Sequence, residues 1–77
     1  IDKESEDLFK LIVKSAFWGR RKTLFKSLSQ SPHIRFEKDI IDKALEMSSI
    51  PPDIRGEKLS TDDYINLAIA FRNLIHQ

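Results

Sequence analysis

The spacing of hydrophobic residues after Ser60 constrains the fold of this chain more than any other feature. Ser60 and Asp63 stand three positions apart, as in a capping box, where two side chains satisfy backbone amides at the start of a helix. The hydrophobic residues that follow fall on one helix face. They are Tyr64, Leu67, Ala68, Phe71, Leu74 and Ile75. The pattern predicts an amphipathic helix that begins at Ser60.

Three earlier segments show the same period. They run from near Ser5 to Gly19, from about Arg20 to Ser29, and from about Glu37 to Ser48. The first has two rows of hydrophobic residues at i, i+4 spacing. These rows are Leu8, Ile12 and Ala16, and Phe9, Val13 and Phe17. Gly19 is expected to end or kink this helix, because glycine weakens a helix interior.

The junction of the first two segments is expected to be anchored in the core by Phe17, Leu24, Phe25 and Leu28. Pro51 and Pro52 stop the third segment, since proline lacks an amide donor and restricts the residue before it. No segment alternates with the period of two that a half-buried strand requires. The sequence therefore predicts an all-α fold, a small bundle of about four to five short helices, helix-turn-helix-like and without a sheet.

Length and cysteine content set the organisation. A chain of 77 residues has room for one modest core, so residues 1–77 are expected to form a single domain. Without cysteine, neither a disulfide nor a cysteine-based zinc site can support it, and apolar packing must do so. The hydrophobic runs are too short to span a membrane. We expect a cytoplasmic monomer, and a first residue Ile1 suggests an excerpt from a longer protein.

Few residues suggest enzymatic chemistry. The only glycines are Gly19 and Gly56, so there is no phosphate-binding loop or dinucleotide fingerprint. His33 and His76 lack the spacing of a metal site. Ser60 is better explained as a helix cap than as a nucleophile, because no base accompanies it. We expect no catalytic, cofactor-binding or metal-binding residue in this chain, which by itself is not an enzyme.

Charge is unevenly distributed along the chain. Residues 8–36 contain seven lysines and arginines and no carboxylate, although the formal net charge of the chain is only +1. Three of these cations are consecutive, and Arg20, Arg21 and Lys22 are called the basic cluster below. Such a cluster favours a polyanion as partner. A solvated face, or salt bridges to the acidic third segment, is the alternative.

Neighbouring residues favour the polyanion. The basic cluster lies at a predicted helix junction, where backbone amides at a helix start also meet phosphate. Lys26 is four positions after Lys22, and Lys10 and Lys14 continue the charge on the preceding helix. Trp18 is close enough to offer a base-stacking surface, unless it is buried in the core. Arginine suits phosphate through its planar fork of donors.

Two stretches carry a family resemblance. "AFWGRRKTLFKSL" resembles the Ala-Phe-x-x-Arg-Arg-Lys-Thr-Leu stretch in the C-terminal domain of ribosomal RNA adenine dimethyltransferases, the KsgA family. "IPPDIRGEKLSTDDYINLAIAF" resembles that family's Ile-x-Pro-x-x-Arg-Ala-Glu-x-Leu-Ser segment and final helix, with Gly56 in place of the usual alanine. Together they cover most of residues 8–75. For Arg55 and Glu57 we favour an ion pair that holds a turn. Erythromycin-resistance methyltransferases share the architecture but match these stretches less well.

The resemblance implies a small helical domain that follows a Rossmann-like methyltransferase domain. That N-terminal domain, outside this chain, would hold S-adenosylmethionine and the catalytic motifs. The family methylates N6 of two adjacent adenines near the 3′ end of small-subunit ribosomal RNA. The expected partners are therefore the small ribosomal subunit with its RNA and the chain's own methyltransferase domain. The resemblance matches Arg20, Arg21 and Lys22 to the family's basic motif. With Lys26, Lys14 and Trp18, which are added from their positions in the sequence, they are the expected RNA-binding residues.

Two other functions stay open at the level of sequence. One is an independent helix-turn-helix module that binds DNA, since short basic helices can enter a major groove. No predicted helix carries a clear set of base-reading side chains, which disfavours it. The other is a protein-interaction domain whose basic face meets an acidic partner.

Overall fold

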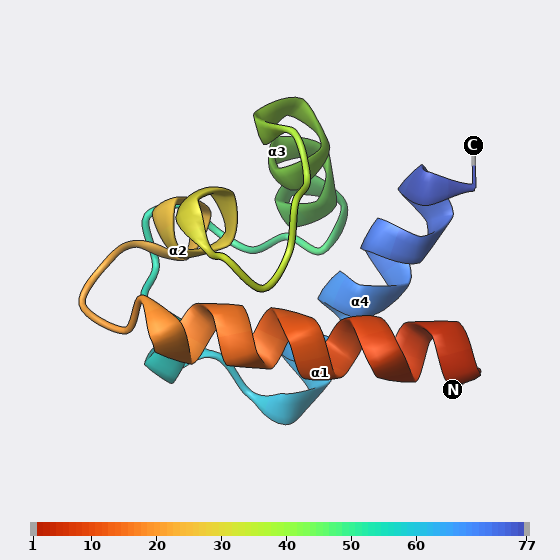
Figure 1. Cartoon of the computed structure of the whole chain (residues 1–77), viewed down its shortest axis with the longest axis horizontal. Helices are drawn as coiled ribbons and strands as arrows, with labels where there is room; N and C mark the ends of the chain where they lie inside the picture. Colours follow the sequence, from red (N-terminus) through yellow and green to blue (C-terminus); the bar gives the residue numbers. More distant parts are fainter. Residues whose placement is uncertain (1, 77) are drawn as a thin grey trace.

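The computed structural model describes residues 2–76 and contains four α-helices and one short 3₁₀ turn (Figure 1). The elements are α1 (Lys3–Trp18), α2 (Leu24–Gln30), α3 (Lys38–Met47), η1 (Gly56–Lys58) and α4 (Thr61–Ile75). Residues 2–76 contain no strand, which confirms the predicted all-α bundle. None of the helices in this range has the length and apolarity that crossing a membrane requires.

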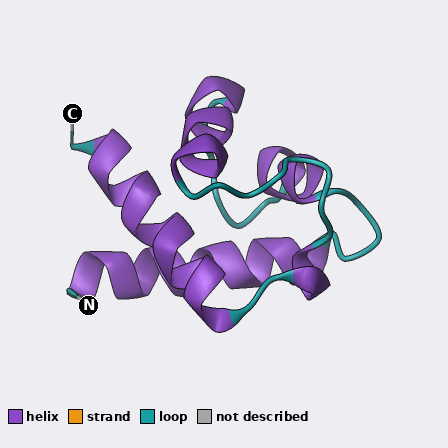
Figure 2. Ribbon diagram, turned by 180° about the vertical axis from the view of Figure 1, so that it is seen from behind, coloured by secondary structure: helices purple, strands orange, loops and turns teal. Residues whose placement is uncertain are grey.

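The long helices α1 and α4 pack against each other, and the shorter helices α2 and α3 pack against them. α1 packs mainly on α4, α3 packs on α4, and α2 bridges α1 and α3. Figures 1 and 2 show α1 and α4 crossing, with both chain ends at the same end of the molecule. The turn between α1 and α2 therefore lies at the opposite end of α1 from the chain termini.

The core takes side chains from every helix. Its members with less than 2% exposure are Ile12, Ala16, Leu24, Leu28, Ile41, Ala44, Leu45, Leu67, Ala68 and Phe71. The Phe36 ring, from the loop before α3, stacks on Phe71 with centroids 4.6 Å apart. The predicted row of Leu8, Ile12 and Ala16 is buried as expected. Burying such side chains is the main favourable term in folding a chain without disulfides or metals.

Helix caps set the element boundaries. The predicted capping box is confirmed, because Asp63 N donates to Ser60 Oγ at 3.1 Å and Ser60 N donates to Asp63 Oδ2 at 3.0 Å. α1 begins at Lys3 rather than near Ser5, because Asp2 Oδ1 accepts from Ser5 N at 2.9 Å. Gly19 ends α1 as predicted. The starts of α1 and α4 thus follow the side chains that satisfy their first free amides, whereas α3 begins after Glu37 without a side-chain cap.

Polar side chains at the start of α1 contact polar side chains at the end of α4. Arg72 Nε lies 2.7 Å from Asp2 Oδ2, although its N–H is not aligned for a hydrogen bond, and 3.4 Å from Glu4 Oε1. His76 Nε2 lies 2.7 Å from both carboxylate oxygens of Glu4. These contacts join the start of α1 to the end of α4. They are partly exposed, so each is expected to add little stability by itself.

The η1 turn is held by Tyr64 and not by the expected ion pair. No ion pair joins Arg55 and Glu57, both exposed, among the described residues. Instead Tyr64 Oη donates to the Gly56 carbonyl oxygen at 2.7 Å within the core. A Cβ at Gly56 would lie 2.7 Å from Tyr64 Oη and 3.0 Å from Ala16 Cβ. Glycine thus lets η1 approach α1 and α4 closely.

Candidate nucleic-acid interface

The basic cluster lies in the turn between α1 and α2, not on a helix. Lys22 N donates to the Gly19 carbonyl oxygen at 2.7 Å, which closes a turn over Gly19–Lys22. The prediction that the second helix begins near Arg20 is wrong, because Thr23 is its N-cap and Lys26 N donates to Thr23 Oγ1 at 3.3 Å. All three cations of the cluster are exposed. The turn that carries them, between α1 and α2, lies at one end of the bundle (Figure 1).

A buried hydrogen bond fixes this turn against α2. Ser27 Oγ donates to the Gly19 carbonyl oxygen at 2.8 Å. A Cβ at Gly19 would lie only 2.6 Å from Ser27 Oγ, so the close approach depends on glycine. The backbone that carries the basic cluster is therefore held in one position relative to the core.

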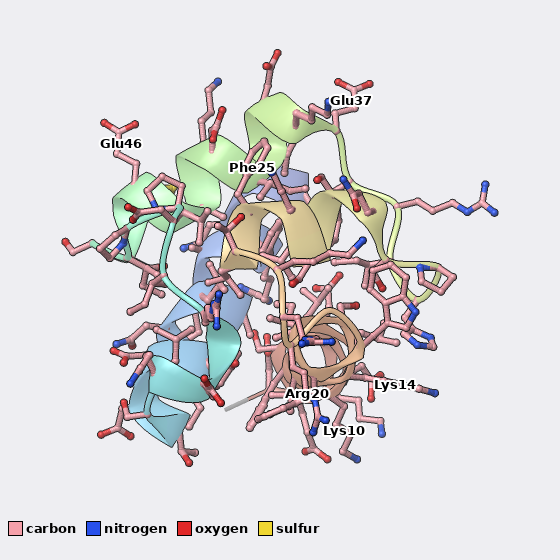
Figure 3. All side chains as sticks on the ribbon, turned by 90° about the vertical axis from the view of Figure 1, so that its left-hand side faces the viewer. Lys10, Lys14, Arg20, Phe25, Glu37 and Glu46 are labelled. Atoms are coloured by element: carbon pink, nitrogen blue, oxygen red, sulfur yellow. The ribbon has the colours of Figure 1, made fainter. Side chains whose placement is uncertain are left out.

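The basic cluster has no acidic partner in the described part of the chain. Among residues 2–76, no carboxylate lies within ion-pair distance of Arg20, Arg21 or Lys22. The alternative of salt bridges to the third helix is therefore wrong for this structure. In Figure 3, Lys10, Lys14 and Arg20 lie around α1, on the side away from Glu37 and Glu46. Lys10 is paired with Glu6 at 3.2 Å, so Lys14 and Arg20 are the cations of this group that a polyanion can meet without displacing an ion pair among residues 2–76.

Two aromatic side chains lie open beside the cluster. Trp18 is 44% exposed and Phe17 is 51% exposed, so neither is buried as an anchor of the core. Both stand in the last turn of α1, where Ser15, Ala16 and Gly19 are the buried residues and the opposite face meets solvent. The expected core position of Phe17 and the alternative of a buried Trp18 are therefore wrong.

The other expected anchors of the junction behave differently from Phe17. Leu24 and Leu28 are fully buried, as predicted. Phe25 is half-buried and packs against the edge of the core. Residues 17–22 line an open hollow of about 270 Å³ at this end of α1. We call it the aromatic–basic hollow.

Lys22 is held over Trp18. Its Nζ lies 5.0 Å from the centroid of the indole ring and donates to Gln30 Oε1 at 2.6 Å. The sequence interpretation missed Gln30, because no spacing rule relates it to Lys22 before α2 folds back on α1. It also missed Phe17 as a surface residue, although its position next to Trp18 at a helix end was a usable signal. Lys22 therefore has an aromatic and a neutral polar partner in the free protein.

Lys26 lies apart from this hollow. The i+4 argument for it fails, because Lys22 precedes the cap of α2 and the two residues share no helix. Lys26 instead lines a second open hollow that contains Asp42 and Asp53. Lys14 is exposed on α1 and makes no ion pair among the described residues. RNA contact by Lys14 and by Lys26 stays a prediction, with stronger support for Lys14.

The backbone amides of α2 do not add an anion site. Leu24 N donates to the Ile54 carbonyl oxygen at 2.6 Å, and Phe25 N donates to the Pro52 carbonyl oxygen at 3.1 Å. With Lys26 N donating to Thr23, the first amides of this seven-residue helix are already satisfied. The expectation that they would meet phosphate is wrong. Any phosphate binding here depends on side chains.

Comparison with curated proteins gives one consistent result. The chain is 40% identical over 74 residues to the ribosomal RNA small subunit methyltransferase A of Streptococcus agalactiae, a match that covers 92% of this chain and 25% of the relative. It is 38% identical over 77 residues to the same-named protein of Caldanaerobacter subterraneus, covering all of this chain and 28% of the relative. It is 43% identical over 65 residues to the same-named protein of Alkaliphilus oremlandii, a match that covers 84% of this chain and 22% of the relative.

These proteins are homologues of the chain. The chain corresponds to the C-terminal quarter of the ribosomal RNA small subunit methyltransferase A proteins, as the motif resemblance implied. The chain thus spans about a quarter of the length of the curated relatives that it matches. No family model matches the chain. No solved structure matches it significantly.

Proposed function

We propose that this chain is the RNA-docking domain of a ribosomal RNA adenine dimethyltransferase. One observation carries the proposal: the basic cluster is exposed, fixed by the bond between Ser27 and Gly19, and free of acidic partners among the described residues. The relatives are named as methyltransferases of ribosomal RNA, which makes that RNA the partner of choice. Contacts to its phosphates would supply affinity and orientation rather than sequence choice.

The methylation chemistry belongs elsewhere in this proposal. The chain matches only about a quarter of each relative, which leaves about three quarters of the relatives' length outside it. The parent enzyme would hold S-adenosylmethionine in an N-terminal methyltransferase domain and transfer methyl groups to N6 of adenines near the 3′ end of small-subunit ribosomal RNA. The helical domain would seat that enzyme on the small ribosomal subunit, in the cytoplasm, as a monomer.

Binding by the isolated chain tests the proposal. Wild-type chain and a variant with Arg20→Ala, Arg21→Ala and Lys22→Ala are titrated against purified small ribosomal subunits, with structured ribosomal RNA or duplex DNA as competitor. We expect the variant to bind more weakly and structured RNA to compete better than DNA. Preferential competition by DNA would favour a helix-turn-helix DNA-binding module. Absence of binding to any nucleic acid at moderate salt would favour a protein-interaction domain.

A further inference from the structure

Trp18 is the feature that the phosphate-docking proposal leaves unused. Its indole is nearly half exposed at the rim of the aromatic–basic hollow, although exposing so large an aromatic surface is unfavourable. The motif that carries the family resemblance leaves position 18 unspecified, so docking through phosphates does not explain this residue. Lys22 Nζ, held by Gln30, lies over the ring.

We propose that Trp18 is a stacking platform for one unpaired RNA base, and that Lys22 covers this platform in the free protein. The proposal rests on the proposed function, because it names the RNA group that the docking surface takes besides phosphate. An indole face suits any nucleobase, since every base has a π-face of its own. The adjacent Arg20 and Arg21 would hold the phosphates that flank the base.

The contacts of Lys22 allow it to move away when RNA binds. Its partners are a neutral amide oxygen of Gln30 and the indole ring, at 2.6 Å and 5.0 Å. Gln30 offers the charged ammonium group a neutral acceptor, whereas a phosphate oxygen carries charge of its own and attracts the ammonium group more strongly. An incoming phosphate would therefore draw the ammonium group away and leave the indole face to the base.

A pair of RNA hairpins separates stacking from charge. Both have the same stem and the same loop backbone, but the loop of one carries bases and that of the other is abasic. We expect Trp18→Ala to weaken binding of the base-bearing hairpin about 5- to 100-fold, because one stacked base is lost. Trp18→Phe, which keeps an aromatic face, should retain most of the affinity. The salt dependence should not change, because the indole is uncharged.

Fluorescence gives a second readout of the same contact. Trp18 is the only tryptophan of the chain, so its emission reports this site alone. We expect the base-bearing hairpin to quench the emission and the abasic hairpin to leave it largely unquenched. Met47→Ala is the matched control, since Met47 is also an exposed apolar residue but lies on α3. Circular dichroism confirms that each variant is folded.

The outcomes distinguish the two proposals. If Trp18→Ala binds both hairpins as the wild type does, while substitution of the basic cluster abolishes binding, the platform is wrong and phosphate docking stands. Equal loss of affinity for both hairpins would also overturn the platform, because the abasic loop has nothing to stack. If the wild-type chain binds neither hairpin nor ribosomal subunits, both proposals fail.

Discussion

The Ser27 hydroxyl donates a buried 2.8 Å hydrogen bond to the Gly19 carbonyl oxygen and so joins the end of α1 to the middle of α2. The basic cluster directly follows Gly19 in the chain. Its three cations are long and exposed, but the backbone that carries them is fixed to the core. This placement reduces the conformational freedom that binding a polyanion would otherwise remove.

Gly19→Ala should destabilise the chain. The new Cβ would lie 2.6 Å from Ser27 Oγ in a packed site, and overpacking typically costs about 1–3 kcal/mol. Ser27→Ala should cost about 1 kcal/mol through the lost hydrogen bond. In the double variant the clash is partly relieved. Its loss of stability should therefore be smaller than the sum of the losses of the two single variants. Urea unfolding of the four proteins measures this, and strict additivity would argue against the contact.

Tyr64→Phe should remove an alkaline transition in stability. Burial raises the pKa of Tyr64 from 10.0 to about 12, so the unfolded chain loses this proton first. Stability from the neutral phenol is complete below about pH 10 and is lost as pH rises toward 12, at up to about 1.4 kcal/mol per pH unit. Tyr64 is the only tyrosine, so tyrosinate absorbance follows its ionisation directly.

The comparison with Tyr64→Phe isolates the phenol from the lysines that titrate in the same range. The variant should also lose about 1 kcal/mol at neutral pH, because the bond to the Gly56 carbonyl is gone. Ionisation of Tyr64 in the folded chain near pH 10 would contradict its burial.

Asp2→Asn should make the chain less sensitive to acid. Hydrogen bonding from Ser5, and to a lesser extent the charge of Arg72, lowers the pKa of the Asp2 carboxyl from 3.8. The charged carboxylate therefore contributes stability above about pH 4, and this contribution is lost as pH falls through the lowered pKa. Asparagine caps a helix about as well as aspartate, so this variant removes charge and keeps the cap.

Asp2→Ala is the control for the cap itself. It should be less stable than Asp2→Asn at every pH, because Ser5 N loses its acceptor. Thermal unfolding between pH 2 and pH 7 gives both comparisons. A constant difference between wild type and Asp2→Asn over this range would show that the carboxylate charge contributes nothing.

Lys14→Ala and Lys26→Ala should differ in their effect on RNA binding. Lys14 is exposed on α1 without an ion pair among the described residues, whereas Lys26 lines the hollow that contains Asp42 and Asp53. We expect the Lys14 variant to bind the base-bearing hairpin more weakly, with a salt slope smaller by about 0.7–0.9. The Lys26 variant should bind nearly as the wild type does. A larger effect at Lys26 would shift the interface onto α2.

Sequence periodicity predicted what depends on local chemistry. The Ser60–Asp63 capping box and the buried row of Leu8, Ile12 and Ala16 follow from neighbours within one or two helix turns. The start of α2 was predicted too early because three consecutive cations are compatible with a helix. Thr23 could have corrected it, since threonine before an apolar run is an N-cap signal.

The composition of the site was predictable, but its geometry was not. Exposure of Phe17 depends on which face of α1 is covered once α2 folds back, and no local pattern specifies that. No local pattern specifies the bond between Lys22 and Gln30 either. The same is true of the hydrogen bonds that the first amides of α2 donate to the carbonyl oxygens of Ile54 and Pro52. These contacts form only once the helices pack together, and the bonds from Leu24 to Ile54 and from Phe25 to Pro52 join segments distant in sequence. The cations of the basic cluster could be identified from the sequence, but the residues that they contact could not.

The salt dependence of RNA binding tests the central claim most directly. Affinity for small ribosomal subunits is measured over a range of salt concentrations for the wild type and for the Arg20→Ala, Arg21→Ala, Lys22→Ala variant. If the basic cluster grips about three phosphates, the slope of log K against log salt should shrink by roughly 2 to 3 units. Unchanged affinity and an unchanged slope in the triple variant would contradict the account.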